Sequence, residues 1–266
     1  MNELPKIDGR SAVPLPEVDG AVLAPGQQGI GAPLPRLEDR RLVSGKGRYA
    51  GNITPTGCLH AFVLRSPVAH ARIKSIDVSE ALATPGLVSI LTGEDYVADG
   101  LGSIPCVSIQ PTITGKNHVR TPFYPLAHDR VTCVGAEVAL VIAKTAALAE
   151  DAAERIVVEY EPLPVVPTLE AAIEPGAPLV WAEAPGNVCF HHEMGSREET
   201  ARAFAEASHV VRARIRNQRL SGNPMEPRTC IGSYDAALDR LELTTSTANP
   251  HRIRLLLAEH IFRVPA

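Results

Sequence analysis

The stretch 138–160 constrains the fold most, because it places a strand, a helix and another strand in direct succession. Val138–Ala143 is a short apolar run of the kind found in buried strands. Ala146–Arg155 is rich in alanine and follows Thr145, a favourable N-cap, and therefore predicts a helix. Ile156–Tyr160 predicts the next strand. We expect a β-α-β unit closed by a right-handed crossover.

The run VVRARIRNQ, residues 210–218, alternates between apolar and mostly basic side chains and therefore predicts a strand. Its two faces differ in chemistry. Val211, Ala213 and Ile215 lie on one face, and Arg212, Arg214 and Arg216 lie on the other. The arginine face could bind an anionic group. A solvated sheet face, or an interface with acidic residues, is the more common arrangement for such a row.

Two helices are predicted in the C-terminal part of the chain. Ser196 lies three residues before Glu199, the spacing of a capping box, and predicts a helix that runs to about Ala207. Asn249 can cap a last helix that has Pro250 at its first position. One apolar stripe runs along a face of this last helix and consists of Ile253, Leu256, Leu257 and Ile261. Because such a stripe needs a cover, we predict that these residues form a partner interface.

Composition limits the class of protein. The net charge is -4 and aromatic residues make up 4%, so we expect no nucleic-acid partner. The five cysteines are widely spaced without a C-x-x-C motif, which fits a reducing compartment. The start of the chain lacks a signal peptide, and no apolar run is long enough to span a bilayer. We expect a soluble cytoplasmic protein with no membrane span. Residues 1–34, rich in proline and glycine, predict a flexible tail.

Motifs that would define an active site are missing. The chain has nine histidines but no H-E-x-x-H pair, and it has neither a G-x-S-x-G elbow nor a phosphate-binding G-x-x-x-x-G-K-[ST] loop. From spacing alone, this is a soluble α/β protein with no self-contained active site.

The motif NPMEPRTCIGSYD, residues 223–235, places Glu226 between two prolines. Glu226 could be a catalytic base, a ligand or a carboxylate that stabilises a turn. Pro224 and Pro227 restrict φ on both sides of it. A rigid turn of this kind favours a structural carboxylate, which accepts backbone amides or pairs with an arginine.

The chain contains, in this order, the segments RLEDRRLVSGKGRYAGNI…LHAFVLRSPVAHARIKSIDVSEALATPGLVSILTGED, RVTCVGAEVALVIAKTAALAEDAAERIVVEYEPLPVVPTLEAAI and NPMEPRTCIGSYD…LELTTSTANPHRIRLLLAEHI. Together they resemble the molybdenum-binding large subunit of the xanthine dehydrogenase and aldehyde oxidase family, which includes aerobic carbon monoxide dehydrogenase. The resemblance covers roughly residues 35–264.

This resemblance implies an α+β fold, with an α/β hammerhead domain followed by the first strands and helix of a molybdopterin-binding domain. It implies the hammerhead domain at residues 35–165. Residues 166–266 are then a linker and the start of a molybdopterin-binding domain that is truncated in this chain. The family's glycine-rich G-G-G-F-G stretch and its glutamate base are absent. The chain also reads Thr247-Ala248-Asn249 where members commonly read Thr-Gln-Asn.

The family reaction is the oxidative hydroxylation of an aldehyde, an N-heterocycle or a similar small molecule, with water as the oxygen source. The implied cofactor is molybdopterin or its cytosine dinucleotide, held in the assembled complex and not by this chain alone. The implied partners are the remaining molybdopterin-domain polypeptide and the iron–sulfur and FAD subunits.

The first hypothesis is that the chain is the N-terminal part or a split subunit of a molybdenum hydroxylase, inactive alone. The alternative is a non-catalytic α/β interaction module, or a truncated fragment, that kept the fold and lost the chemistry. Under either hypothesis we predict no catalytic residue and no metal ligand in this chain. The candidates for lining a cofactor pocket are Glu226, Arg228 and Asn249.

Overall fold

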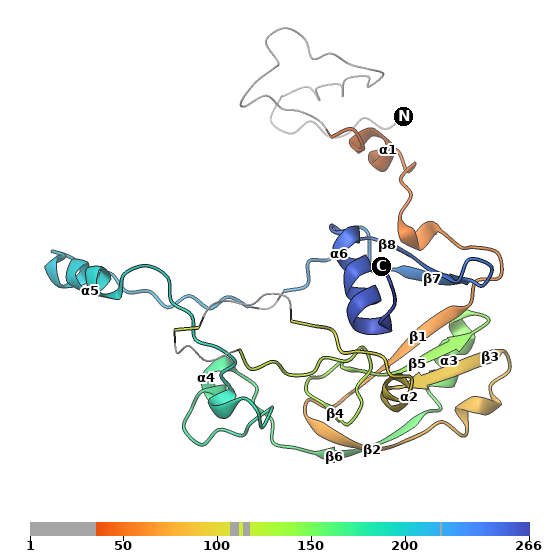
Figure 1. The fold of residues 1–266 in the computed structure, drawn as a ribbon, viewed down its shortest axis with the longest axis horizontal. Coiled ribbons are helices and arrows are strands. Elements are labelled where there is room, and N and C mark those ends of the chain that lie inside the picture. Colours follow the sequence, from red (N-terminus) through yellow and green to blue (C-terminus); the bar gives the residue numbers. More distant parts are fainter. Residues whose placement is uncertain (1–35, 107–111, 114–117, 219) are drawn as a thin grey trace, which may run out of the picture. The chain divides into compact units, whose positions relative to one another are not determined.

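The structure is a computed structural model that describes residues 36–106, 112–113, 118–218 and 220–266 (Figure 1). The tail predicted at residues 1–34 lies outside the described residues. The chain divides into two compact units. Unit 1 comprises the described residues up to Ile53 together with Pro224–Ser246. Unit 2 comprises Thr54–Asn223 together with Thr247–Ala266.

Unit 2 contains two three-stranded antiparallel sheets. The first has the order β1-β5-β3. Its strands are β1 (His60–Arg65), β5 (Glu137–Ala143) and β3 (Leu87–Thr92). The central strand β5 matches the predicted apolar run. Its side chains of Val138, Ala139, Val141 and Ala143 are fully buried. This strand has neighbours on both edges and cover on both faces, which explains why its sequence hardly alternates.

The second sheet has the order β4-β2-β6. Its strands are β4 (Arg130–Val131), β2 (Ala71–Asp77) and β6 (Val157–Pro162). Ala71 of β2, Val131 of β4 and Val138 of β5 form one buried cluster, so the second sheet packs against the central strand of the first. A second cluster lies where β5 meets the following helix and includes Ala139, Val141 and Ile156.

Helix α3 (Ala146–Ala153) follows β5 and is capped by Thr145 as predicted, with the Leu148 amide donating to Thr145 Oγ1 at 3.2 Å. Its small buried side chains allow close packing on the first sheet. The strand after it, β6, pairs with β2 in the second sheet and not with β5. The predicted right-handed β-α-β crossover is therefore wrong. Local pattern identified the three elements, but the partner of a strand depends on residues far away in the chain.

The other helices of unit 2 are short. They are α2 (Gly93–Ala98), α4 (Leu169–Ala172), α5 (Arg197–Glu206), α6 (Pro250–Leu255), a π-helical continuation of α6 (Leu256–Phe262), and two 3₁₀ turns (Ala81–Ala83 and Pro185–Asn187). Helix α5 confirms the predicted start, because Ser196 Oγ accepts the Glu199 amide at 3.2 Å. Helix α6 confirms Asn249 as its cap and Pro250 as its first residue.

Residues 210–218 form no strand, and the strand predicted there is wrong. Val211 and Ile215 are 91% and 87% exposed. A strand exists only beside a hydrogen-bonded neighbour, and no other part of the described chain supplies one here.

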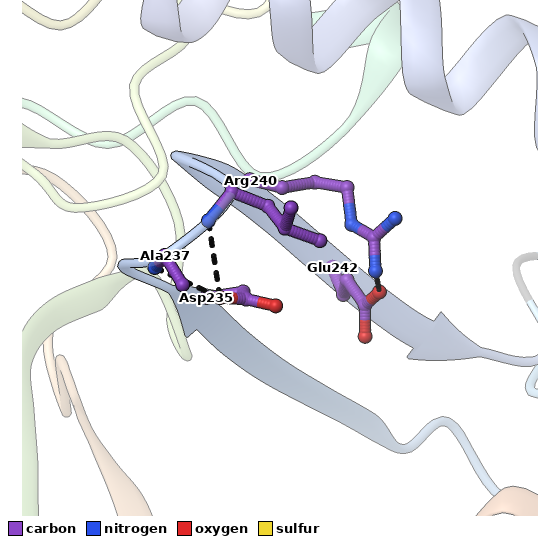
Figure 2. A network of polar contacts seen from close by, with 5 residues as sticks. Asp235, Ala237, Arg240 and Glu242 are labelled. Carbon is purple, nitrogen blue, oxygen red and sulfur yellow. Dashed lines mark hydrogen bonds and ion pairs between the residues drawn. The ribbon is translucent and has the colours of Figure 1, made fainter.

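Unit 1 contains helix α1 (Asp39–Val43), a 3₁₀ turn (Ala50–Asn52) and the antiparallel hairpin of β7 (Cys230–Asp235) and β8 (Arg240–Thr245). Figure 2 shows the end of the hairpin. The Asp235 carboxylate accepts the amides of Ala237 and Leu238 at 2.9 and 3.2 Å, and the Arg240 guanidinium pairs with Glu242. The hydrogen bonds to Asp235 close the turn between the two strands, whereas the Arg240–Glu242 pair lies within β8.

Candidate functional site

Glu226 lies in unit 1, in the loop that enters β7, and its side chain is half-buried. Its Oε1 accepts the backbone amide of Ala50 at 3.1 Å, and its Oε2 accepts the Ser246 hydroxyl at 3.1 Å. Both carboxylate oxygens are therefore used within the fold. Hydrogen bonds to a charged acceptor are stronger than neutral ones, so this carboxylate ties the 3₁₀ turn to the hairpin.

Neighbouring contacts support the same arrangement. The Tyr49 amide donates to Asn52 Oδ1 at 3.0 Å and stabilises the turn that presents the Ala50 amide. The Thr245 hydroxyl donates to the Thr229 carbonyl at 2.9 Å, which holds the two ends of the hairpin together. The geometry agrees with the interpretation of Glu226 as a structural carboxylate. That Glu226 lines a cofactor pocket stays a prediction.

Arg228 and Asn249, the other two pocket candidates, differ in their side-chain contacts. Arg228 is exposed, and no side-chain hydrogen bond or ion pair joins it to another described residue. Asn249 belongs to unit 2 and accepts the Arg252 amide at 3.0 Å through Oδ1, as an N-cap does. Arg228 is thus the candidate whose charged group is left open for an anion. That Arg228 and Asn249 line a cofactor pocket stays a prediction.

The predicted interface stripe on the last helix is partly covered within unit 2. Ile261 is only 6% exposed, and its carbonyl accepts the Gly102 amide at 3.0 Å. Ile253, Leu256 and Leu257 are half-buried. Ile261 therefore offers little free surface. The use of this stripe as a partner interface stays a prediction.

An apolar cavity of about 340 Å³ lies where the last helix meets the first sheet. Phe262 lines it together with sheet residues that include Val63, Leu91 and Leu140. Two carboxylates, Asp99 and Glu137, lie at its wall. Glu137 is paired with Arg65 at 2.7 Å. An apolar lining with a paired carboxylate suits hydrophobic packing better than proton transfer.

Tyr96 also lines this cavity, and sequence reasoning did not single it out. Its hydroxyl donates to the Gly102 carbonyl at 2.8 Å. Burial raises the pKa of Tyr96, and the neighbouring Tyr124 raises it further. The phenol therefore stays protonated and acts as a donor. No pattern of spacing marks Tyr96, Gly102 and Phe262, because they meet only after folding.

Within residues 36–106, 112–113, 118–218 and 220–266, no three histidine, cysteine or acidic side chains form a group that could hold a metal ion. The five cysteines are free thiols. None of the helices found in these ranges has the length and apolar character needed to cross a bilayer.

Two family descriptions match the chain in succession. Residues 44–164 match "Aldehyde oxidase and xanthine dehydrogenase, a/b hammerhead domain". Residues 180–266 match "Molybdopterin cofactor-binding domain". The two matches agree with the order of domains expected from the sequence.

Similar proteins include the nicotine 6-hydroxylase large subunit of Paenarthrobacter nicotinovorans, 38% identical over 86% of this chain and 27% of that protein. The carbon monoxide dehydrogenase large chain of Afipia carboxidovorans is 35% identical over 87% of this chain and 29% of that protein. Among solved structures, quinoline 2-oxidoreductase from Pseudomonas putida 86 matches with a TM-score of 0.70 and 36% identity, over 85% of this chain and 28% of that chain. The chain thus spans less than a third of the length of these relatives.

A hammerhead domain followed by molybdopterin-binding sequence defines a molybdenum hydroxylase large subunit. The chain belongs to the xanthine dehydrogenase and aldehyde oxidase family. More particularly, it corresponds to the N-terminal portion of the family's molybdenum-binding large subunit, with the expected α+β fold.

Proposed function

We propose that this chain contributes the hammerhead domain and the first part of the molybdopterin-binding domain to a cytoplasmic molybdenum hydroxylase. The complex hydroxylates an aldehyde, an N-heterocycle or a similar small molecule, with water as the oxygen source. The observation that carries the proposal is the ordered match of the two family domains at residues 44–164 and 180–266. The names of the relatives, which include a nicotine hydroxylase large subunit, support the reaction class.

The residues present fit a supporting role better than a cofactor cradle. Glu226 and Asn249 use their side-chain oxygens within the fold, and of these three candidates Arg228 alone presents a charge with no partner among the described residues. We therefore propose that molybdopterin, free or as its cytosine dinucleotide, is bound in the assembled complex and that this chain alone is inactive. Bound there, the molybdenum cofactor would supply the oxidising centre. The remaining molybdopterin-domain polypeptide and the iron–sulfur and FAD subunits are the proposed partners.

Co-expression with the polypeptide encoded immediately downstream tests this function. The expected complex contains this chain, molybdenum measured by plasma mass spectrometry and pterin measured by fluorescence, and it reduces a dye with an aldehyde or N-heterocycle. The isolated chain should show neither metal nor turnover. Turnover by the isolated chain would show that it is not an incomplete subunit.

A non-catalytic interaction module is the second candidate. The observation that favours it is the structural use of the Glu226 carboxylate, whose two oxygens accept hydrogen bonds from within the fold. A stable complex that lacks both molybdenum and pterin would favour this candidate over the hydroxylase.

A further inference from the structure

Residues 193–218 form a continuous segment in which every residue is exposed, here called the exposed arm. Its first part holds helix α5, drawn in cyan in Figure 1. Phe204 of this helix is 62% exposed. A helix of ten residues gains little stability in water without packing against another surface. We therefore expect the exposed arm to pack against another surface.

The second part of the exposed arm, residues 210–217, has the sequence pattern of a strand but no neighbour. Val211 and Ile215 are almost fully exposed. Apolar residues at every second position, here Val211, Ala213 and Ile215, favour a strand whose one face is buried. The unpaired amides and carbonyls of such a segment are able to extend the sheet of a partner. Residues 210–217 therefore have the sequence pattern of a strand, but no described strand pairs with them.

The opposite face of this segment carries a row of three arginines, of which Arg216 already contacts an acid. Its guanidinium lies 3.6 Å from the Glu170 carboxylate. No ion pair joins Arg212 or Arg214 to any described residue. A partner that carries carboxylates opposite these two arginines would have complementary charge.

We propose that residues 210–217 dock as an added edge strand on a β-sheet of the polypeptide that completes the molybdopterin-binding domain. Val211, Ala213 and Ile215 face the apolar layer of that sheet. Arg212 and Arg214 face carboxylates on its other side. This docking rests on the proposed function, since it needs that polypeptide as the partner.

The apolar face distinguishes this partner from a small anion. A phosphate group would occupy the arginine face and would leave Val211 and Ile215 in water. A sheet edge would pair with the backbone of the segment, and the apolar layer that packs on that sheet would cover Val211 and Ile215. The alternation of the whole segment, and not the charge alone, is therefore the basis of the proposal.

Hydrogen exchange of the isolated chain and of the co-expressed complex tests the docking. The amides of residues 210–217 should exchange freely in the isolated chain and be protected in the complex. Protection already present in the isolated chain would mean that the segment pairs within its own chain, and would overturn the proposal. Free exchange in a complex that contains molybdenum would overturn the docking while leaving the proposed function intact. If no complex forms, both fail.

Two double variants test the two faces. Arg212→Glu with Arg214→Glu, and separately Val211→Asp with Ile215→Asp, should each weaken binding of the partner roughly 30-fold or more. The matched control is Arg41→Glu with Arg155→Glu, which makes the same change in charge on exposed arginines outside the arm. It should leave affinity within about 3-fold of the parent.

Urea unfolding of each isolated variant should match the parent, because all the substituted side chains are exposed. Unchanged affinity in either arm variant would overturn the proposal. A loss of molybdenum at unchanged affinity in the arginine variant would also overturn it, since the arginines would then bind the cofactor's phosphate.

Discussion

Glu226 shows how one carboxylate joins segments that are distant in sequence. Its two hydrogen-bond donors are the Ala50 amide, 176 positions before it, and the Ser246 hydroxyl, 20 positions after it. The nearby prolines favoured a structural role for Glu226 from the sequence, but the motif did not identify either donor. Both donors lie too far along the chain for a local sequence pattern to predict them.

Removal of this carboxylate should loosen unit 1. Glu226→Ala is expected to lower the local opening free energy at the Ala50 amide by about 1–2 kcal/mol, because two hydrogen bonds to a charged acceptor are lost at a half-exposed site. Hydrogen exchange at Ala50 measures this, with Glu154→Ala at an exposed position as the control. Loss of turnover in the complex with unchanged Ala50 exchange in Glu226→Gln would instead indicate a chemical role.

Gly102 is a second residue at which a distant contact decides the outcome. A Cβ at this position would lie 1.7 Å from the His260 carbonyl oxygen, which belongs to backbone and cannot rotate away. Gly102→Ala should therefore destabilise unit 2 by about 1–3 kcal/mol in urea unfolding. Gly222→Ala meets no atom within 4 Å and should be near neutral. Equal stability of the two variants would contradict the close approach.

Asp95 is expected to titrate below the usual range of an aspartate. Hydrogen bonds from the side chain and backbone of Thr92 lower the pKa of Asp95. The ionised form therefore favours the folded state above the ordinary value of about 3.9, and this contribution is lost as pH falls through the lower folded pKa. NMR titration should show the Asp95 midpoint rising in Thr92→Val, while that of Asp77, lowered by Ser79, stays in place.

At the scale of elements, the last helix was the most predictable. Asn249 and Pro250 occupy the cap and the first helical position, as their local chemistry requires. Continuation of this helix as a π-helical segment was not predicted. That segment places Phe262 at the wall of the apolar cavity, opposite residues of the first sheet, and contains the buried Ile261.

Loss of the Asn249 cap should weaken this helix specifically. Asn249→Ala is expected to cost about 1 kcal/mol in urea unfolding, since the Arg252 amide loses its acceptor. Asn249→Asp keeps an acceptor and should retain most of the stability. Were both variants equally destabilised, the amide of Asn249 would have a role beyond capping, and its place among the cofactor-pocket candidates would gain support.

At the scale of the whole molecule, the two units differ in what stabilises them. The buried apolar side chains found among the described residues all belong to unit 2. Unit 1 has a two-stranded hairpin, and an isolated hairpin is marginally stable in water. Hydrophobic burial therefore stabilises unit 2, whereas unit 1 depends on hydrogen bonds such as those to Glu226.

Hydrogen exchange of the isolated chain should separate the units. The amides of β7 and β8 are expected to exchange orders of magnitude faster than those of the central strand β5, because local opening of a hairpin exposes little apolar surface. Comparable protection of β5 and β7 would contradict this and would show that unit 1 is stabilised by contacts of the same strength as the core of unit 2.

The sequence by itself determined the local elements and the family. Caps at Thr145, Ser196 and Asn249, and the apolar run of β5, are local features, and they were found where expected. Ordered motifs identified the hammerhead and molybdopterin-binding sequence without any structure.

Only the tertiary structure decided which strands pair and which side chains form hydrogen bonds within the fold. β5 and β6 enter different sheets, residues 210–218 stay unpaired, and Glu226 binds an amide from the far end of the chain. The physical reason is the same in each case. A strand or a carboxylate is satisfied by whichever partner folding brings beside it, and a local pattern specifies the need for that partner but not its identity.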